Sequence, residues 1–300
     1  MAQAVPKLLT WDAQLLSRVE SLEWRSRVLV EGFLQGSHHS LLRGFSAEFA
    51  QYQPYVAGDD TRYLDWRAYA RLDRLYLRQF EAETNLRAHI VVDASGSMDY
   101  KSDGQHFRKY DYACMLAAAL MRLLQTQSDA FGLAVVRQRM EHYIRPQVSR
   151  SHFLRCLSIL EQTKSQGEGE LANRLRDLAE IIGRRGLVVV ISDFWDDIDG
   201  LVEAMKRLRY DRHEVVLMQT VDPRELDFEL GQGGLFEDME TGARLPLAPI
   251  TVRKRYLDAL GQHQAALKHA ALELGAELCQ IRTDEPPFGA LAQFLTRRRR

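Results

Sequence analysis

VVDASGSM, residues 91–98, sets polar side chains where an apolar run stops. The apolar residues predict a buried β-strand over 86–95. Asp93, Ser95 and Ser97 follow at every second position, so a carboxylate and two hydroxyls leave the strand end together. Such oxygens are the ligands that hard divalent cations prefer, and Mg²⁺ keeps several waters beside them. The alternative is that Asp93 or a serine only caps the next helix.

The chain from residue 86 onward alternates between predicted strands and helices. After the strand over 86–95, we expect strands at 131–137, 139–146, 186–194, 214–221 and 277–283, and a hairpin over 235–247 turning at Thr241-Gly242. Helices are expected at 107–127, 151–163, 170–182, 198–212, 251–275 and 288–299. This alternation predicts an α/β fold: a doubly wound, mostly parallel sheet with helices on both faces.

A second strand delivers another carboxylate. The run GLVVVISDF, residues 186–194, is strongly β-branched and contains Asp193 near its end. Ligands of doubly wound sheets bind outside the carboxyl ends of the strands, near a topological switch point. We therefore predict a Mg²⁺ site formed by Asp93, Ser95, Ser97 and Asp193, in which the serines ligate directly and the aspartates hold the waters of the metal.

Two enzymatic interpretations of VVDASGSM are disfavoured by its neighbours. A phosphatase with an aspartyl nucleophile usually has a second acid two residues on, where this chain has Ser95. A serine nucleophile elbow needs the pattern G-x-S-x-G, which neither serine satisfies. A metal-dependent phosphoester hydrolase stays open as the alternative function.

The composition is ordinary for a soluble globular protein, with 46% hydrophobic and 27% charged residues among 300. A formal net charge of −1 gives no global field to attract nucleic acid or anionic lipid. The three dispersed cysteines indicate reduced thiols. The longest apolar run, 113–121, is too short to span a membrane, and the first residues lack a signal-peptide core. We expect a cytoplasmic protein without membrane span.

Two blocks carry a resemblance to known families. At DASGSM, residues 93–98, the sequence resembles the von Willebrand factor A domain. The metal-ion-dependent adhesion site of that domain uses D-x-S-x-S after the first strand, a threonine from a second loop and an aspartate after the fourth strand. Residues 44–71, GFSAEFAQYQPYVAGDDTRYLDWRAYAR, and the LYLRQFEAETN that follows at 75–85, resemble the signature of the bacterial Domain of Unknown Function 58 family.

The resemblance implies a von Willebrand factor A-like domain over residues 84–300. Residues 1–83 would form an N-terminal helical and charged, aromatic segment packed on that domain. Asp93, Ser95 and Ser97 match the first element of the adhesion site, and Asp193 matches the last. The threonine is missing, because the matching run GEGEL at 167–171 has Gly169 in its place. Either the metal loses a ligand, or Glu168 or Glu170 serves instead.

The resemblance also implies a partner rather than a substrate. Members of the family are similar to components that act beside MoxR-type AAA+ ATPases in chaperone-like assembly of a client protein. In adhesion sites of this kind an acidic side chain of the partner completes the coordination of the metal, so the expected function is binding and the chain is not expected to be an enzyme. The Gly58-Asp59-Asp60 block is interpreted as a partner surface, as a second metal site, or as a salt-bridge and capping network that fixes the N-terminal segment to the sheet. Phe194 and Trp195 would form an aromatic anchor if exposed, or pack against the N-terminal block if buried.

Overall fold

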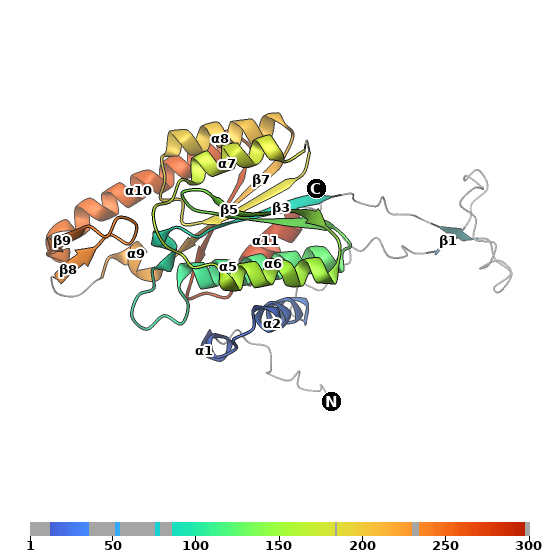
Figure 1. The fold of residues 1–300 in the computed structure, drawn as a ribbon, viewed down its shortest axis with the longest axis horizontal. Helices are drawn as coiled ribbons and strands as arrows, with labels where there is room; N and C mark the ends of the chain where they lie inside the picture. Colours follow the sequence, from blue (N-terminus) through green and yellow to red (C-terminus); the bar gives the residue numbers. More distant parts are fainter. Residues whose placement is uncertain are drawn as a thin grey trace.

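The computed structural model describes residues 13–35, 52–54, 76–78, 86–183, 185–229 and 234–297 (Figure 1). Within these ranges the central sheet has six strands in the order β10-β7-β6-β3-β4-β5. Neighbouring strands are parallel except for β5, which pairs antiparallel with β4 at one edge. The strands are β3 (Arg87–Asp93), β4 (Ala130–Val136), β5 (Met140–Gln147), β6 (Leu187–Ser192), β7 (Glu214–Val221) and β10 (Glu277–Arg282). The expected doubly wound, mostly parallel α/β fold is confirmed.

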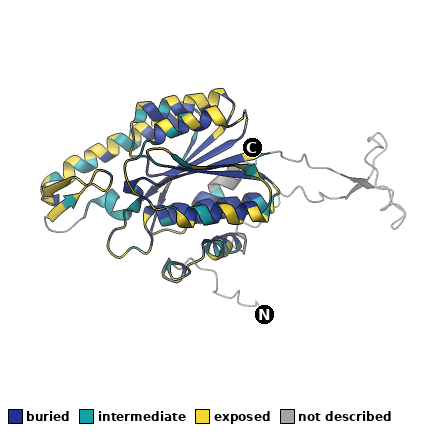
Figure 2. Cartoon of the chain, in the orientation of Figure 1, coloured by how far each residue is buried: buried dark blue, intermediate teal, exposed yellow. Residues whose placement is uncertain are grey.

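Helices cover both faces of this sheet (Figure 1). One face packs against α5 (Lys109–Thr126), α6 (Arg150–Gln162) and α11 (Phe288–Arg297). The other face packs against α7 (Leu171–Ile181), α8 (Ile198–Tyr210) and α10 (Pro249–Glu273). Because both faces are covered, the central strands are buried along almost their whole length (Figure 2). This explains why their sequences are continuous apolar runs instead of alternating ones.

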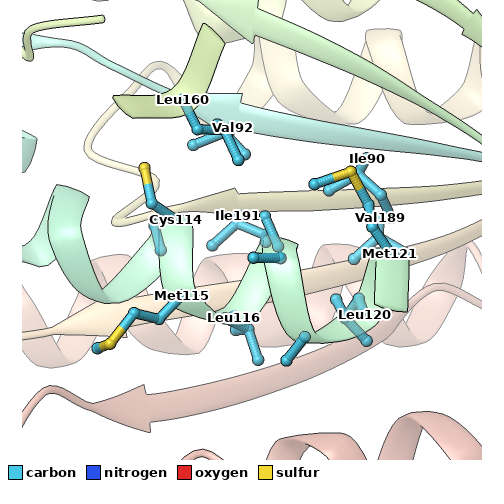
Figure 3. Packing of buried hydrophobic residues seen from close by; sticks show 14 of the residues in the cluster. Ile90, Val92, Cys114, Met115, Leu116, Leu120, Met121, Leu160, Val189 and Ile191 are labelled. Carbon is cyan, nitrogen blue, oxygen red and sulfur yellow. The ribbon is translucent and has the colours of Figure 1, made fainter. Parts of the chain in front are cut away.

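The core on the α5 side is made by side chains that alternate along β3 and β6. Ile90 and Val92 of β3 point to the same layer as Val189 and Ile191 of β6, and all four are fully buried. Figure 3 shows them opposite side chains of α5, including Leu116. The intervening residues of both strands belong to the second cluster, under α7 and α8. The register of β3 against β6 is therefore specified from both faces.

Some elements were not expected from the sequence. A short 3₁₀ helix, η2 (Gly96–Asp99), follows β3, and α9 (Pro223–Asp227) follows β7. The expected hairpin is present as β8 (Gly234–Glu237) and β9 (Arg244–Leu247), paired antiparallel. It lies beside α9 and α10 (Figure 1), and its turn approaches the loop that follows β3.

The N-terminal helices form a further layer beneath α5. α1 (Ala13–Ser17) precedes α2 (Leu22–Gln35), which packs on α5 and α6. Leu29 and Phe33 of α2 are buried in the same core cluster as α5. β1 (Tyr52–Pro54) pairs antiparallel with β2 (Tyr76–Arg78). The Gly58-Asp59-Asp60 block lies outside the described residues, so its role and the boundary at residue 83 stay predictions.

The packing of α2 gives a stability test. Phe33 is 1% exposed, and we expect Phe33→Ala to lower the free energy of unfolding by about 3–5 kcal/mol, because truncation leaves a cavity between α2 and the core. Trp24 on the same helix is 59% exposed, so Trp24→Ala should change it by less than about 0.5 kcal/mol. Denaturant unfolding of both variants measures the difference. Equal stability of the two variants would show that α2 is not part of the cooperative core.

Candidate functional site

The predicted site residues meet where β3 and β6 end. These strands are parallel neighbours, and Val92 pairs with Ile191, so Asp93 and Ser192 lie side by side. Ser192 Oγ donates a hydrogen bond to Asp93 Oδ2 at 2.7 Å. In the strand order of the sheet, β4, which follows β3 in the sequence, is the neighbour of β3 on one side, and β6 is its neighbour on the other. The two strand ends therefore form the topological switch point at which ligands of such sheets bind.

The DASGS loop gathers its polar atoms at this point. Asp93 Oδ1 accepts a hydrogen bond from the Ser95 backbone amide at 2.8 Å, which fixes the loop as an Asx turn. The hydroxyl oxygens of Ser95 and Ser97 lie 3.1 Å apart. Asp93 and Ser95 are buried. The three side chains with which the sequence analysis began are thus in one place, and their role as metal ligands stays a prediction.

Asp193 is held by a buried lysine that the sequence analysis did not assign. Lys109, the first residue of α5, is 1% exposed. Its Nζ donates to Asp193 Oδ2 at 2.7 Å and to Glu225 Oε1 at 2.6 Å. Burial alone would lower the pKa of Lys109, but the charges of Asp193 and Glu225 raise it above its ordinary value. The ammonium therefore stays charged and neutralises part of the buried negative charge.

A third strand end contributes Glu225. Asp222 directly follows β7 and caps α9, accepting from the Arg224 amide at 2.9 Å, while Glu225 Oε2 accepts from the Asp222 amide at 2.8 Å. This reciprocal capping box leaves Glu225 Oε1 facing Lys109. The pattern Asp-Pro-Arg-Glu directly after a predicted strand is the sequence signal that could have identified Glu225. No comparable signal marks Lys109.

The two aromatic residues after Asp193 have different environments. Phe194 is buried, has a left-handed φ of 58° and packs in the core cluster under α7 and α8. Trp195 is 40% exposed and stacks on His263 of α10, with ring centroids 4.8 Å apart. The interpretation that these aromatics, if buried, pack against the N-terminal block stays a prediction for Phe194, because most of residues 44–83 lie outside the described residues.

Gly169 lies at the site, and an unexpected carboxylate lies beside it. The Gly169 amide donates to Glu240 Oε2 at 3.4 Å, and Ser97 is a second polar neighbour of this carboxylate. Glu240 belongs to the turn between β8 and β9. Of the residues considered as substitutes for the missing threonine, Glu168 is exposed, and Glu170 accepts a hydrogen bond from Arg174 at 3.1 Å.

The electrostatics of the cluster favour a bound cation. Burial, together with the charge of Asp193, raises the pKa of Asp93 to about 6, against hydrogen bonds from Ser192 and Ser95. Burial and Asp193 also raise the pKa of Glu240. Lys109 is the cation that the described residues place among these carboxylates. Buried carboxylates in excess over cations raise one another's pKa values, and a divalent ion would relieve this.

The oxygen donors fit a hard cation such as Mg²⁺. Within the described ranges, no three side chains of His, Cys, Asp or Glu come together as a metal site by themselves. A cation here would therefore depend on the hydroxyls of Ser95 and Ser97 as well as on carboxylates. Among the described residues, Asp193 Oδ1 accepts one long hydrogen bond, 3.3 Å from the Trp195 amide, so it retains capacity to hold a water.

The fold and the site define the chain as a doubly wound α/β domain with an oxygen-rich site at its switch point. More particularly, the chain belongs to the DUF58 family, described as "Protein of unknown function DUF58", whose model matches residues 51–266. The family expected from the sequence is thereby confirmed. Within the described residues, no helix combines the length and the apolar character needed to cross a membrane.

The chain is also similar to other bacterial proteins and to several solved structures. The chain is 28% identical over 296 residues to an uncharacterized protein of Mycobacterium tuberculosis (strain ATCC 25618 / H37Rv), covering 96% of this chain and 91% of the relative. An uncharacterized protein of Mycobacterium bovis matches to the same extent. The conserved hypothetical protein BatB from Bacteroides thetaiotaomicron is similar at 15% identity and a TM-score of 0.45, over 71% of this chain and 98% of that one. The SpRpn10 VWA domain is similar at 13% identity and a TM-score of 0.41, over 70% and 95%.

The buried lysine yields a test of the charge balance. We expect Lys109→Met to lower the free energy of unfolding by about 3–5 kcal/mol, because it leaves Asp193 and Glu225 buried without their cation. Lys206 on α8 is exposed, and Lys206→Met should change stability by less than about 0.5 kcal/mol. Thermal and urea unfolding compare the two variants. Wild-type stability of Lys109→Met would mean that the two carboxylates do not depend on this ammonium.

Proposed function

We propose that this chain is a protein-interaction module whose switch-point site binds Mg²⁺ and, through it, an acidic side chain of a partner. The observation that carries the proposal is the convergence of Asp93, Ser95 and Ser97 with Asp193, from two neighbouring strand ends, in a cluster with excess negative charge. Ser95 and Ser97 would ligate the ion, and the two aspartates would hold its waters. Mg²⁺ retains exchangeable waters, one of which a partner carboxylate would replace.

The surroundings of the site support an interaction surface. Trp195, next to Asp193, is 40% exposed, and aromatic side chains of this kind are frequent interface anchors. Leu235 and Leu245 of the β8–β9 hairpin are 64% and 57% exposed. Large exposed apolar side chains beside a polar site are typical of surfaces that bind other proteins.

The partner in this proposal is an AAA+ ATPase of MoxR type, acting with this chain on a client protein in complex assembly or activation. Its support is the resemblance of residues 44–71 and 93–98 to the family signature, together with membership of the DUF58 family. The proposal locates the complex in the cytoplasm. Cys114, Cys156 and Cys279 are buried and are not joined in disulfides, which suits a reducing compartment.

A metal-dependent phosphoester hydrolase is the alternative. The buried carboxylates do not separate the two functions, because a bound divalent cation would offset their charge toward a phosphate ester as well as toward a partner carboxylate. Turnover of a generic phosphoester with added Mg²⁺ or Mn²⁺ distinguishes the two functions. Turnover that is lost in Asp93→Ala would favour the hydrolase.

Cation-dependent capture of the ATPase tests the proposal. We expect EDTA, and independently Asp93→Ala, to weaken binding of the MoxR-type ATPase by at least about fivefold, the lower end of usual coupling between two ligands. Asp177→Ala, at an exposed position on α7, is the matched control and should bind as wild type. Circular dichroism and thermal unfolding should show that Asp93→Ala keeps its fold. ATPase binding that is unchanged by both EDTA and Asp93→Ala would contradict the proposal. The interaction surface would then be sought in residues 44–83.

A further inference from the structure

The tip of the β8–β9 hairpin lies against the DASGS loop, although β3 and β8 are far apart in the sequence. A methyl group added to Gly96 would run into the Met239 backbone carbonyl. The same methyl group would lie 3.1 Å from Glu240 Cα. The close approach of the two backbones therefore requires glycine at position 96, and it brings the hairpin tip to the end of β3.

The turn holds Glu240 in a defined position at this tip. Asp238 Oδ1 accepts a hydrogen bond from the Glu240 amide at 2.9 Å, and Asp238 Oδ2 accepts one from Thr241 Oγ1 at 2.8 Å. Gly242, with a left-handed φ of 71°, donates its amide to the Asp238 carbonyl at 2.8 Å. These bonds fix the backbone on both sides of Glu240, so its side chain is presented to the site by a preorganised turn.

The carboxylate of Glu240 lies beside the position that a side chain at residue 169 would take. A methyl group on Gly169 would be 2.9 Å from Ser95 Cβ and 3.5 Å from Glu240 Oε1. Glu240 Oε2 accepts from the Gly169 amide, and Ser97 is a polar neighbour of the same carboxylate. Gly169 thus supplies no oxygen donor from its own side chain, and the hairpin places a carboxylate beside it.

From this geometry we infer that Glu240 is a protein ligand of the cation, taking the place of the hydroxyl that position 169 does not supply. The inference rests on the cation site of the proposed function and adds a residue to it. A carboxylate in place of a hydroxyl adds one negative charge, which strengthens binding of a hard divalent ion. Since the ion would contact Ser95 and Ser97 on one side and Glu240 on the other, it would tie the hairpin to the sheet.

The experiment measures Mg²⁺ and Mn²⁺ affinity of the full chain by calorimetry. We expect Glu240→Gln and Glu240→Asp each to weaken metal binding at least about tenfold. Mutation of a residue that only supports a metal ligand usually costs about tenfold or more in affinity, so a direct ligand should cost no less. Glu240→Asp keeps the negative charge but shortens the side chain. A loss of metal affinity in this variant would therefore show that Glu240 ligates the ion directly and does not act through its charge alone. Glu237→Gln is the matched control, because Glu237 lies on the same hairpin, paired with Arg244, and should bind metal as wild type.

Hydrogen exchange of the hairpin provides a second readout. Mg²⁺ should protect amides around residues 238–242 in the wild type and in Glu237→Gln, but not in Glu240→Gln. Wild-type affinity and protection in both Glu240 variants would overturn the inference and leave the proposed function standing. Absence of metal binding by the wild type would overturn both. If metal binding depends on Glu240 but EDTA leaves ATPase capture unchanged, the inference is supported and the proposed function is contradicted.

Discussion

Burial of several carboxylates at one edge of the sheet is the constraint that connects the fold of this protein to its proposed function. Asp93 and Asp193 reach that edge because β3 and β6 are parallel neighbours whose register is specified by packing on both faces. Lys109 compensates part of the charge, and hydrogen bonds from Ser192 and Ser95 stabilise another part. A divalent cation would neutralise the remaining negative charge and would find two adjacent hydroxyls as ligands.

Much of this arrangement could be predicted from the sequence because it depends on local patterns and one rule of topology. The apolar runs before Asp93 and Asp193 indicate strands buried on both faces. Parallel strands share a carboxyl edge, so the D-x-S-x-S motif and the second aspartate could be assigned to one site before the structure was known. The hairpin over 235–247 was also predictable from its turn residues, although its contact with the loop after β3 was not.

The residues that the sequence did not reveal act across long separations. Lys109 is 84 residues from Asp193, and Glu240 is 71 residues from Gly169. A lysine at a helix start and a glutamate in a turn are ordinary in those positions, so neither carries a local signal of its tertiary partner. The differing burial of Phe194 and Trp195 likewise depends on the left-handed backbone at Phe194, which apolar patterning does not encode.

The most direct test of the account is a crystal structure of the full chain grown with Mn²⁺, with anomalous scattering used to locate the ion. The account predicts an anomalous peak at the carboxyl ends of β3 and β6, in contact with the side chains of Ser95, Ser97 and Glu240. Well-ordered density for these residues without a peak between them, at Mn²⁺ concentrations that saturate the chain in solution, would contradict it.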